Sequence, residues 1–118
     1  MTFLRQPLGL KQPKAKPRPD YLAAVRQLPC CICAAWGMPQ LTPTTAHHVI
    51  CGRYGQRKTP DIMAVPLCDG HHQGQWDTTK LAIHRDRDAW VAAYGPDTDW
   101  IAATQDALAH LLEDASNG

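Results

Sequence analysis

The sequence predicts a small α+β domain, in which a two-stranded hairpin is surrounded by helices and closed by a metal. A short β-branched stretch and a second short apolar stretch lie on either side of a Gly-containing loop, and apolar residues at helical spacing flank them. A pair of potential metal ligands stands before the hairpin and another at its end. At 118 residues the chain fits one domain with an arm. Only 7% of its residues are aromatic, so a small core would benefit from a metal staple.

The charged residues are distributed unevenly along the chain. Residues 1–19 are rich in proline and contain five cations before the first acid, Asp20, whereas no Lys or Arg follows Arg87. We expect residues 1–19 to be a basic flexible arm, either a solvated tail or a DNA contact, and residues 20–118 to form the folded domain. The five cations are Arg5, Lys11, Lys14, Lys16 and Arg18.

The domain begins with a predicted short helix from Tyr21 to Leu28, which Asp20 can cap and Pro29 ends. The segment PCCIC then begins a tight knuckle. A strand is predicted from Thr44 to Ile50, because this stretch is β-branched and short.

A basic loop, Cys51 to Pro60, leads to a second predicted strand, Ile62 to Leu67, so that the two strands form a hairpin. A helix carrying the two histidines of PLCDGHH is expected to start at Asp69 or Gly70. A further helical segment would run from Asp77 or Thr78 to Tyr94, before Gly95-Pro96. Asp97 or Thr98 would cap a last helix, Asp99 to Glu113.

Four residues have the spacing of a structural zinc site. The CxxC of Cys30 and Cys33 offers two thiolates on one side of a tight turn, and the CxxH of Cys68 and His71 offers a thiolate and an imidazole. Cys31 could compete with Cys30, but it lies only two residues from Cys33. The alternative is a set of buried apolar cysteines, which is what we expect of Cys51.

The cysteines also bear on the compartment. The chain shows neither a signal-peptide pattern nor an apolar run of about 20 residues. We therefore expect a protein of the reducing cytosol, without a membrane partner, in which cysteines bind metal rather than form disulfides.

The remaining histidines suggest hydrolysis of a phosphodiester. A neutral imidazole is a suitable general base near pH 7, and His48 fits this role, with His47 and His72 as ligands of a second, open metal site. Neighbours in a regular strand point to opposite faces, so His47 and His48 share one site only if the strand bends or ends there. The alternative is one structural and one exposed histidine. The loop between the strands would offer Arg53, Arg57 and Lys58 to the DNA backbone.

The succession PCCIC, AHHVI, KTPD and VPLCDGHH resembles the HNH or ββα-metal endonuclease superfamily, most of all its phage recombination-enhancement (Ref-like) branch. The resemblance covers Leu28 to Trp76. It implies a treble-clef/ββα fold with a structural zinc knuckle, and an endonuclease that cleaves DNA with Mg2+ or another divalent cation. It implies these roles for the residues named above: general base for His48, catalytic-metal ligands for His47 and His72, and zinc ligands for the two Cys-containing pairs.

The chain departs from the family pattern at two positions. The central Asn would fall near Met63, and the closest polar residue is Asp61, which we assign with His48 to the catalytic group. Where relatives have a further His, four residues after the pair, this chain has Trp76. His84 could take its place from the next helix, although a lone histidine is more often an ordinary surface residue.

The resemblance also implies a setting, namely DNA recombination or processing in a bacterial or phage-infected cytoplasm, with a recombinase-DNA filament as a possible partner. The alternative is a non-catalytic zinc module that binds nucleic acid or a protein.

Overall fold

The structure is a computed structural model that describes residues 16–52 and 59–117, and it has the α+β class that the sequence predicts. Within the described residues, no helix is long and apolar enough to cross a membrane. The elements are, in chain order, α1 (Pro19–Val25), α2 (Cys31–Trp36), β1 (Thr44–His48), the 3-10 turn η1 (Asp61–Met63), β2 (Ala64–Cys68), α3 (Arg87–Tyr94), the 3-10 turn η2 (Asp97–Trp100) and α4 (Ile101–Asn117).

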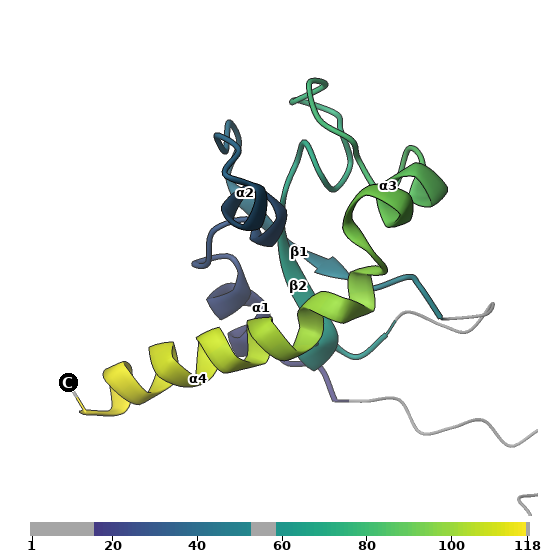
Figure 1. Ribbon diagram of the computed structural model, residues 1–118. Coiled ribbons are helices and arrows are strands. Elements are labelled where there is room, and N and C mark those ends of the chain that lie inside the picture. Colours follow the sequence, from purple (N-terminus) through teal and green to yellow (C-terminus); the bar gives the residue numbers. More distant parts are fainter. Residues whose placement is uncertain (1–15, 53–58, 118) are drawn as a thin grey trace, which may run out of the picture.

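The centre of the fold is the antiparallel hairpin of β1 and β2, which confirms the predicted pairing. The strand ends differ from the prediction, because β1 ends at His48 and residues 61–63 form η1 before β2 begins. Thr44 lies opposite Cys68 and His48 opposite Ala64. All five residues of β2 are buried, because α1, α2 and α4 contact this strand. Figure 1 shows α4 passing below the hairpin, with α2 and α3 above it on different sides.

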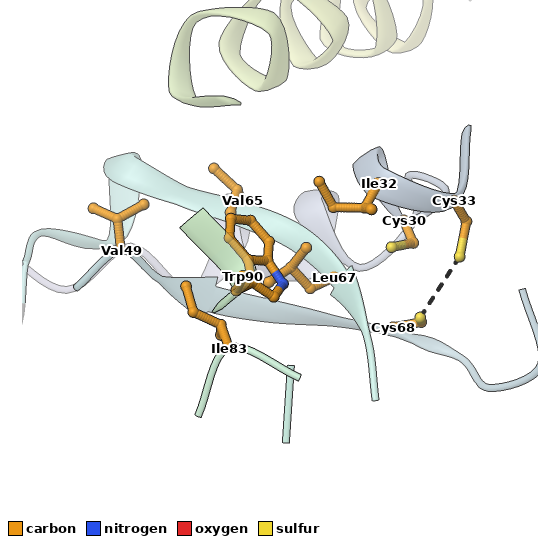
Figure 2. Close-up of a cluster of buried hydrophobic side chains, with 9 residues drawn as sticks. All are labelled: Cys30, Ile32, Cys33, Val49, Val65, Leu67, Cys68, Ile83 and Trp90. Atoms are coloured by element: carbon orange, nitrogen blue, oxygen red, sulfur yellow. Dashed lines mark hydrogen bonds between the residues drawn. The ribbon is translucent and has the colours of Figure 1, made fainter. Parts of the chain in front are cut away.

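The hydrophobic core lies between the hairpin and the segments that cover it. Trp90 from α3 is fully buried and packs with Leu67 and Val65 of β2 and with Ile83, which precedes α3 (Figure 2). The buried cysteines extend this cluster toward α2. The core therefore ends in a group of thiols.

No helix begins at Asp69 or Gly70, so this prediction is wrong. Residues 69–73 form turns, in which the N–H of His72 bonds to the carbonyls of Cys68 and Asp69. Gly74 ends this single turn in the left-handed region at φ 66°, where its N–H bonds to the carbonyl of Asp69. A Cβ at Gly74 would lie 2.8 Å from the Cβ of Ala82, so the turn requires glycine.

The segment after this turn is also less helical than predicted. Asp77 does not start a helix, because its carboxylate binds Lys80 and Thr79 instead. The helix α3 begins only at Arg87, after the N-cap Asp86, whose carboxylate accepts a bond from the N–H of Ala89. Its end at Gly95 is as predicted.

The terminal helices form with shifted ends. The helix α1 begins at Pro19 and ends at Val25, and Asp20 lies in its first turn rather than at its cap. The last helix begins with η2 and continues as α4 to Asn117. Asp97 does not cap it, because the Asp97 carboxylate is fully buried beside β1.

The loop after β2 is organised by one carboxylate. Asp69 accepts bonds from the backbone N–H groups of Gln75, Trp76 and Asp77, at 3.3, 2.7 and 2.8 Å. We predict that Asp69→Ala lowers the free energy of unfolding by about 3 kcal/mol, because these N–H groups lose their acceptor in a largely buried place. Urea unfolding of the metal-loaded protein measures the change.

Asp88→Ala is the matched control, because this carboxylate is 93% exposed and its nearest cation, Arg87, lies 3.7 Å away. It should leave the stability almost unchanged. An equal effect of the two substitutions would contradict the role given to Asp69.

Candidate functional site

Four buried side chains from three segments meet at the base of the hairpin, and they are the four that the spacing predicts. Cys30 and Cys33 come from the start of α2, Cys68 ends β2, and His71 follows in the turn. Nδ1 of His71 lies 3.5 Å from Sγ of Cys30, 3.6 Å from Sγ of Cys33 and 3.5 Å from Sγ of Cys68. The sulfurs of Cys33 and Cys68 are 3.8 Å apart.

These distances are the edges of a tetrahedron of the size that zinc requires. With Zn–S of about 2.3 Å and Zn–N of about 2.0 to 2.1 Å, an ideal centre has S···S edges of about 3.8 Å and S···N edges of about 3.5 Å. A disulfide would need sulfurs about 2.05 Å apart, and all five cysteines are free. The cluster could therefore hold a metal such as zinc without rearrangement.

The electrostatics of the cluster favour a thiolate. A hydrogen bond from Cys30 lowers the pKa of Cys68 to about 3, with a further contribution from His71, although burial alone would raise it. The same interaction with Cys68, together with burial, raises the pKa of Cys30. Lys80 lies close enough that its own pKa is raised, mainly by Asp77 and also by the thiols of Cys33 and Cys68. This ammonium complements the negative charge of three thiolates around a dication.

The local structure explains which cysteines take part. Cys30 is the N-cap of α2, so Cys30 and Cys33 lie one turn apart on the same side, whereas Cys31 points elsewhere. Gln40 fixes the knuckle to the hairpin, because it accepts a bond from the N–H of Cys30 and donates to Thr44 Oγ1. Cys31 and Cys51 stay outside the cluster, and burial raises the pKa of both, that of Cys31 to about 12.

A second cluster consists of three imidazoles. His47, His72 and His84 each offer a nitrogen, and these nitrogens lie within 4.8 Å of one another. The ring centroids are 4.9 Å apart for His47 and His72, 5.3 Å for His47 and His84, and 5.0 Å for His72 and His84. His47 is buried, His72 half-buried and His84 exposed, so the cluster opens toward solvent on the side of His84.

His47 is oriented by a carboxylate from the other end of the chain. Its Nε2–H donates to Asp97 at 2.8 Å, and Asp97 also accepts from the N–H groups of Ile50 and Cys51. Burial alone would raise the pKa of Asp97, but these hydrogen bonds, that from His47 first, lower it. Nδ1 of His47 is buried, and no described residue forms a hydrogen bond with it. A carboxylate on one nitrogen and a free lone pair on the other is the usual arrangement of a metal-bound histidine.

His72 is held in the complementary tautomer by Thr45. The Thr45 hydroxyl donates its single proton to the carbonyl of Leu67 at 2.7 Å, so it accepts from Nδ1–H of His72, also at 2.7 Å. The lone pair of His72 is therefore on Nε2. Burial, followed by repulsion from His47 and His84, lowers the pKa of His72 to about 3. The ring is thus neutral at pH 7, which is the form that binds metal.

His84 reaches the cluster through the backbone. The N–H of Ile83 bonds to the carbonyl of His71, and the N–H of His84 bonds to that of His72, at 3.0 and 3.1 Å. His84 is an exposed residue that lies beside His47 and His72, as the expected substitute ligand would, but its predicted placement on a helix is wrong, because residues 83–85 form a turn. Trp76, by contrast, is 79% exposed and contributes no ligand. Thr45 and Asp97 were not identified from the sequence, because no spacing rule connects either residue to its histidine.

His48 lies outside the three-histidine cluster, as the alternation of a regular strand requires. Its Nε2 lies 2.7 Å from Oδ1 of Asp61, and Oδ2 of the same carboxylate accepts from the backbone N–H of Arg18. His48 is still close enough to contribute to the lowered pKa of His72. Arg53, Arg57 and Lys58, which we predicted to bind DNA, lie outside the described residues.

Comparison with known proteins identifies a family. The family described as "Protein of unknown function (DUF968)" matches residues 1–111, and the chain belongs to it. No match was found among curated proteins or solved structures.

The first cluster leads to a prediction about stoichiometry. The full chain should bind one zinc ion per molecule in its thiol cluster, and Cys33→Ser should abolish this binding and lower the melting temperature strongly, because the folding of such a small core is linked to the metal. Cys31→Ser, two positions away, should keep the zinc. Zinc content by mass spectrometry and thermal unfolding measure both, and a Cys31→Ser protein without zinc would contradict the assigned ligand set.

The second cluster leads to a prediction about Thr45. Thr45→Val keeps the β-branched shape but removes the hydroxyl that selects the tautomer of His72, so affinity for Mn2+ or Ni2+ should fall about 10- to 100-fold. Titration calorimetry on zinc-loaded protein measures this change. Thr44→Val is the control, because its hydroxyl bonds to Gln40 and not to a histidine. Equal affinities of the two variants would rule out this role for Thr45.

Proposed function

We propose that this protein is a metal-dependent endonuclease of the HNH type, which hydrolyses phosphodiester bonds in DNA. The observation that carries the proposal is the three-histidine cluster, with its buried, unpartnered His47 Nδ1 and a neutral His72 directed by Thr45. The resemblance of the AHHVI and VPLCDGHH segments to HNH nucleases supports the same function. Structural zinc in the thiol cluster would fix the base of the hairpin. The hairpin carries His47 and His48 on β1, and the turn that follows β2 carries His71 and His72.

The donor set favours a transition metal over Mg2+ at this cluster. Mg2+ prefers oxygen ligands, whereas imidazoles suit ions such as Mn2+, Co2+, Ni2+ or Zn2+. The ligands would be His47, His72 and His84. A cation bound there would supply a Lewis acid for a phosphate oxygen and charge for the developing negative transition state. Asp97 and Thr45 would keep the lone pairs of two ligands directed at it.

In this proposal His48 is the general base. Because its Nε2–H donates to Asp61, the lone pair lies on Nδ1, where it can accept a proton from water. The His48 side chain is 17% exposed, which leaves the ring accessible to a water and a substrate. Asp61 orients the ring and stabilises the imidazolium that forms, in the manner of a carboxylate behind a catalytic histidine.

The proposal does not depend on a helix after β2. A ββα nuclease carries metal ligands on that helix, whereas here one turn carries His72 and a backbone pairing adds His84. The three imidazoles nevertheless converge. We propose DNA processing in a bacterial or phage-infected cytoplasm as the setting, and a recombinase-DNA filament as a candidate partner, on the resemblance alone.

The test is nicking of supercoiled plasmid by zinc-loaded protein with Mn2+ or Mg2+. His48→Ala should reduce the rate about 10²- to 10⁴-fold, the usual contribution of a general base, with unchanged zinc content and melting temperature. Asp61→Asn should cause a smaller loss, because the amide still contacts the ring but does not stabilise its charged form.

Gln105→Ala is the control, because its side chain interacts with the carbonyl of Ile62 and with Tyr21, and bonds to no histidine among the described residues. If the wild-type protein binds DNA but does not cut it with any divalent metal, the alternative of a non-catalytic zinc module replaces the nuclease.

A further inference from the structure

The solvent side of the three-histidine cluster continues into a cavity of about 410 Å³. Ile50, Ile83 and residues 84–88 line this cavity. His84 belongs to both the cavity and the metal cluster. A ligand in this cavity would therefore lie against the exposed edge of the proposed metal site.

Two arginines and two aspartates line the cavity, and three of these four charged groups already have a partner within the fold. The Asp86 carboxylate is occupied as the N-cap of α3, where it accepts from the N–H of Ala89. Arg87 and Asp88 are paired with each other, with Nε and Oδ1 3.7 Å apart. The backbone N–H of Arg85 bonds to the carbonyl of Ala82, but its guanidinium has no hydrogen bond or ion pair within the part of the chain that the structure describes. Its guanidinium is therefore the cation that the fold leaves for an external anion.

Arg85 is also held in a defined place. A Cβ at Gly74 would come within 3.1 Å of both Cδ and Nε of Arg85, so the side chain lies against the backbone of the turn that follows His72. Arg85 is the direct neighbour of His84, whose N–H is bound to the carbonyl of His72. One short backbone pairing thus positions a metal ligand and a cation together.

We propose that this cavity binds the sugar-phosphate backbone of DNA next to the scissile bond, and that Arg85 contacts a phosphate there. This inference rests on the proposed nuclease function and adds to it the place where the substrate enters. A guanidinium suits the role, because it stays charged and can donate two parallel hydrogen bonds to a phosphate. The half-buried side chain of Ile50 would contact sugar or base without reading sequence.

The experiment measures binding separately from cutting. In the zinc-loaded full chain with His48→Ala, which prevents cleavage, the affinity for a fluorescent DNA duplex and for a single strand is measured by anisotropy at several salt concentrations. Adding Arg85→Ala should weaken binding about 5- to 10-fold and reduce the slope of log affinity against log salt by about one. Arg85→Lys should restore most of the slope, because it keeps the charge.

Arg26→Ala is the matched control, because Arg26 is an exposed arginine that follows α1, on a different side of the hairpin from α3 (Figure 1). It should change neither affinity nor slope. Equal effects of Arg85→Ala and Arg26→Ala, or no effect of either, would overturn the proposal. A wild-type protein that never cuts DNA while Arg85→Ala still lowers the slope would refute the nuclease and leave this binding site standing.

Discussion

The constraint on which the rest of the structure depends is the convergence of three thiols and one imidazole at the base of the hairpin. Those groups are buried, and their mutual distances match the edges of a tetrahedral zinc site. The cluster joins the start of α2 to the end of β2, and the apolar core of Leu67, Ile83 and Trp90 continues directly from it (Figure 2). A core this small gains from such a cross-link, because few apolar side chains are available to offset the chain entropy.

The sequence was sufficient for features that depend on local chemistry. The CxxC and CxxH spacings identified the four residues that meet in the thiol cluster, and the two predicted strands pair with each other. The end of α3 at Gly95 followed from the restricted backbone of a Gly-Pro step. These features depend on a few neighbouring residues, so tertiary contacts had little opportunity to override them.

The features that could not be predicted depend on partners distant in sequence. Asp69 looked like a helix start, but its carboxylate is engaged by three N–H groups six to eight residues further on, which draws the chain into a loop. Asp97 looked like a helix cap, yet it lies 50 residues from the histidine that it orients. His84 was expected to come from a helix, but a backbone pairing between two irregular segments, and not a helical period, places it beside His72. Single-sequence rules contain no term for such contacts.

The adjacency of His71 and His72 has a thermodynamic consequence. One ring belongs to the thiol cluster and the next to the three-histidine cluster, and a single turn with Gly74 at its end holds both. An ion in the thiol cluster would order the turn that also carries His72. An ion that then binds the three-histidine cluster would not have to order this turn again, so the conformational entropy of the turn would be lost only once. The two affinities are then coupled, and by reciprocity each ion strengthens the binding of the other by the same factor. The chain would assemble its metals in order of affinity, with the thiol cluster filled first.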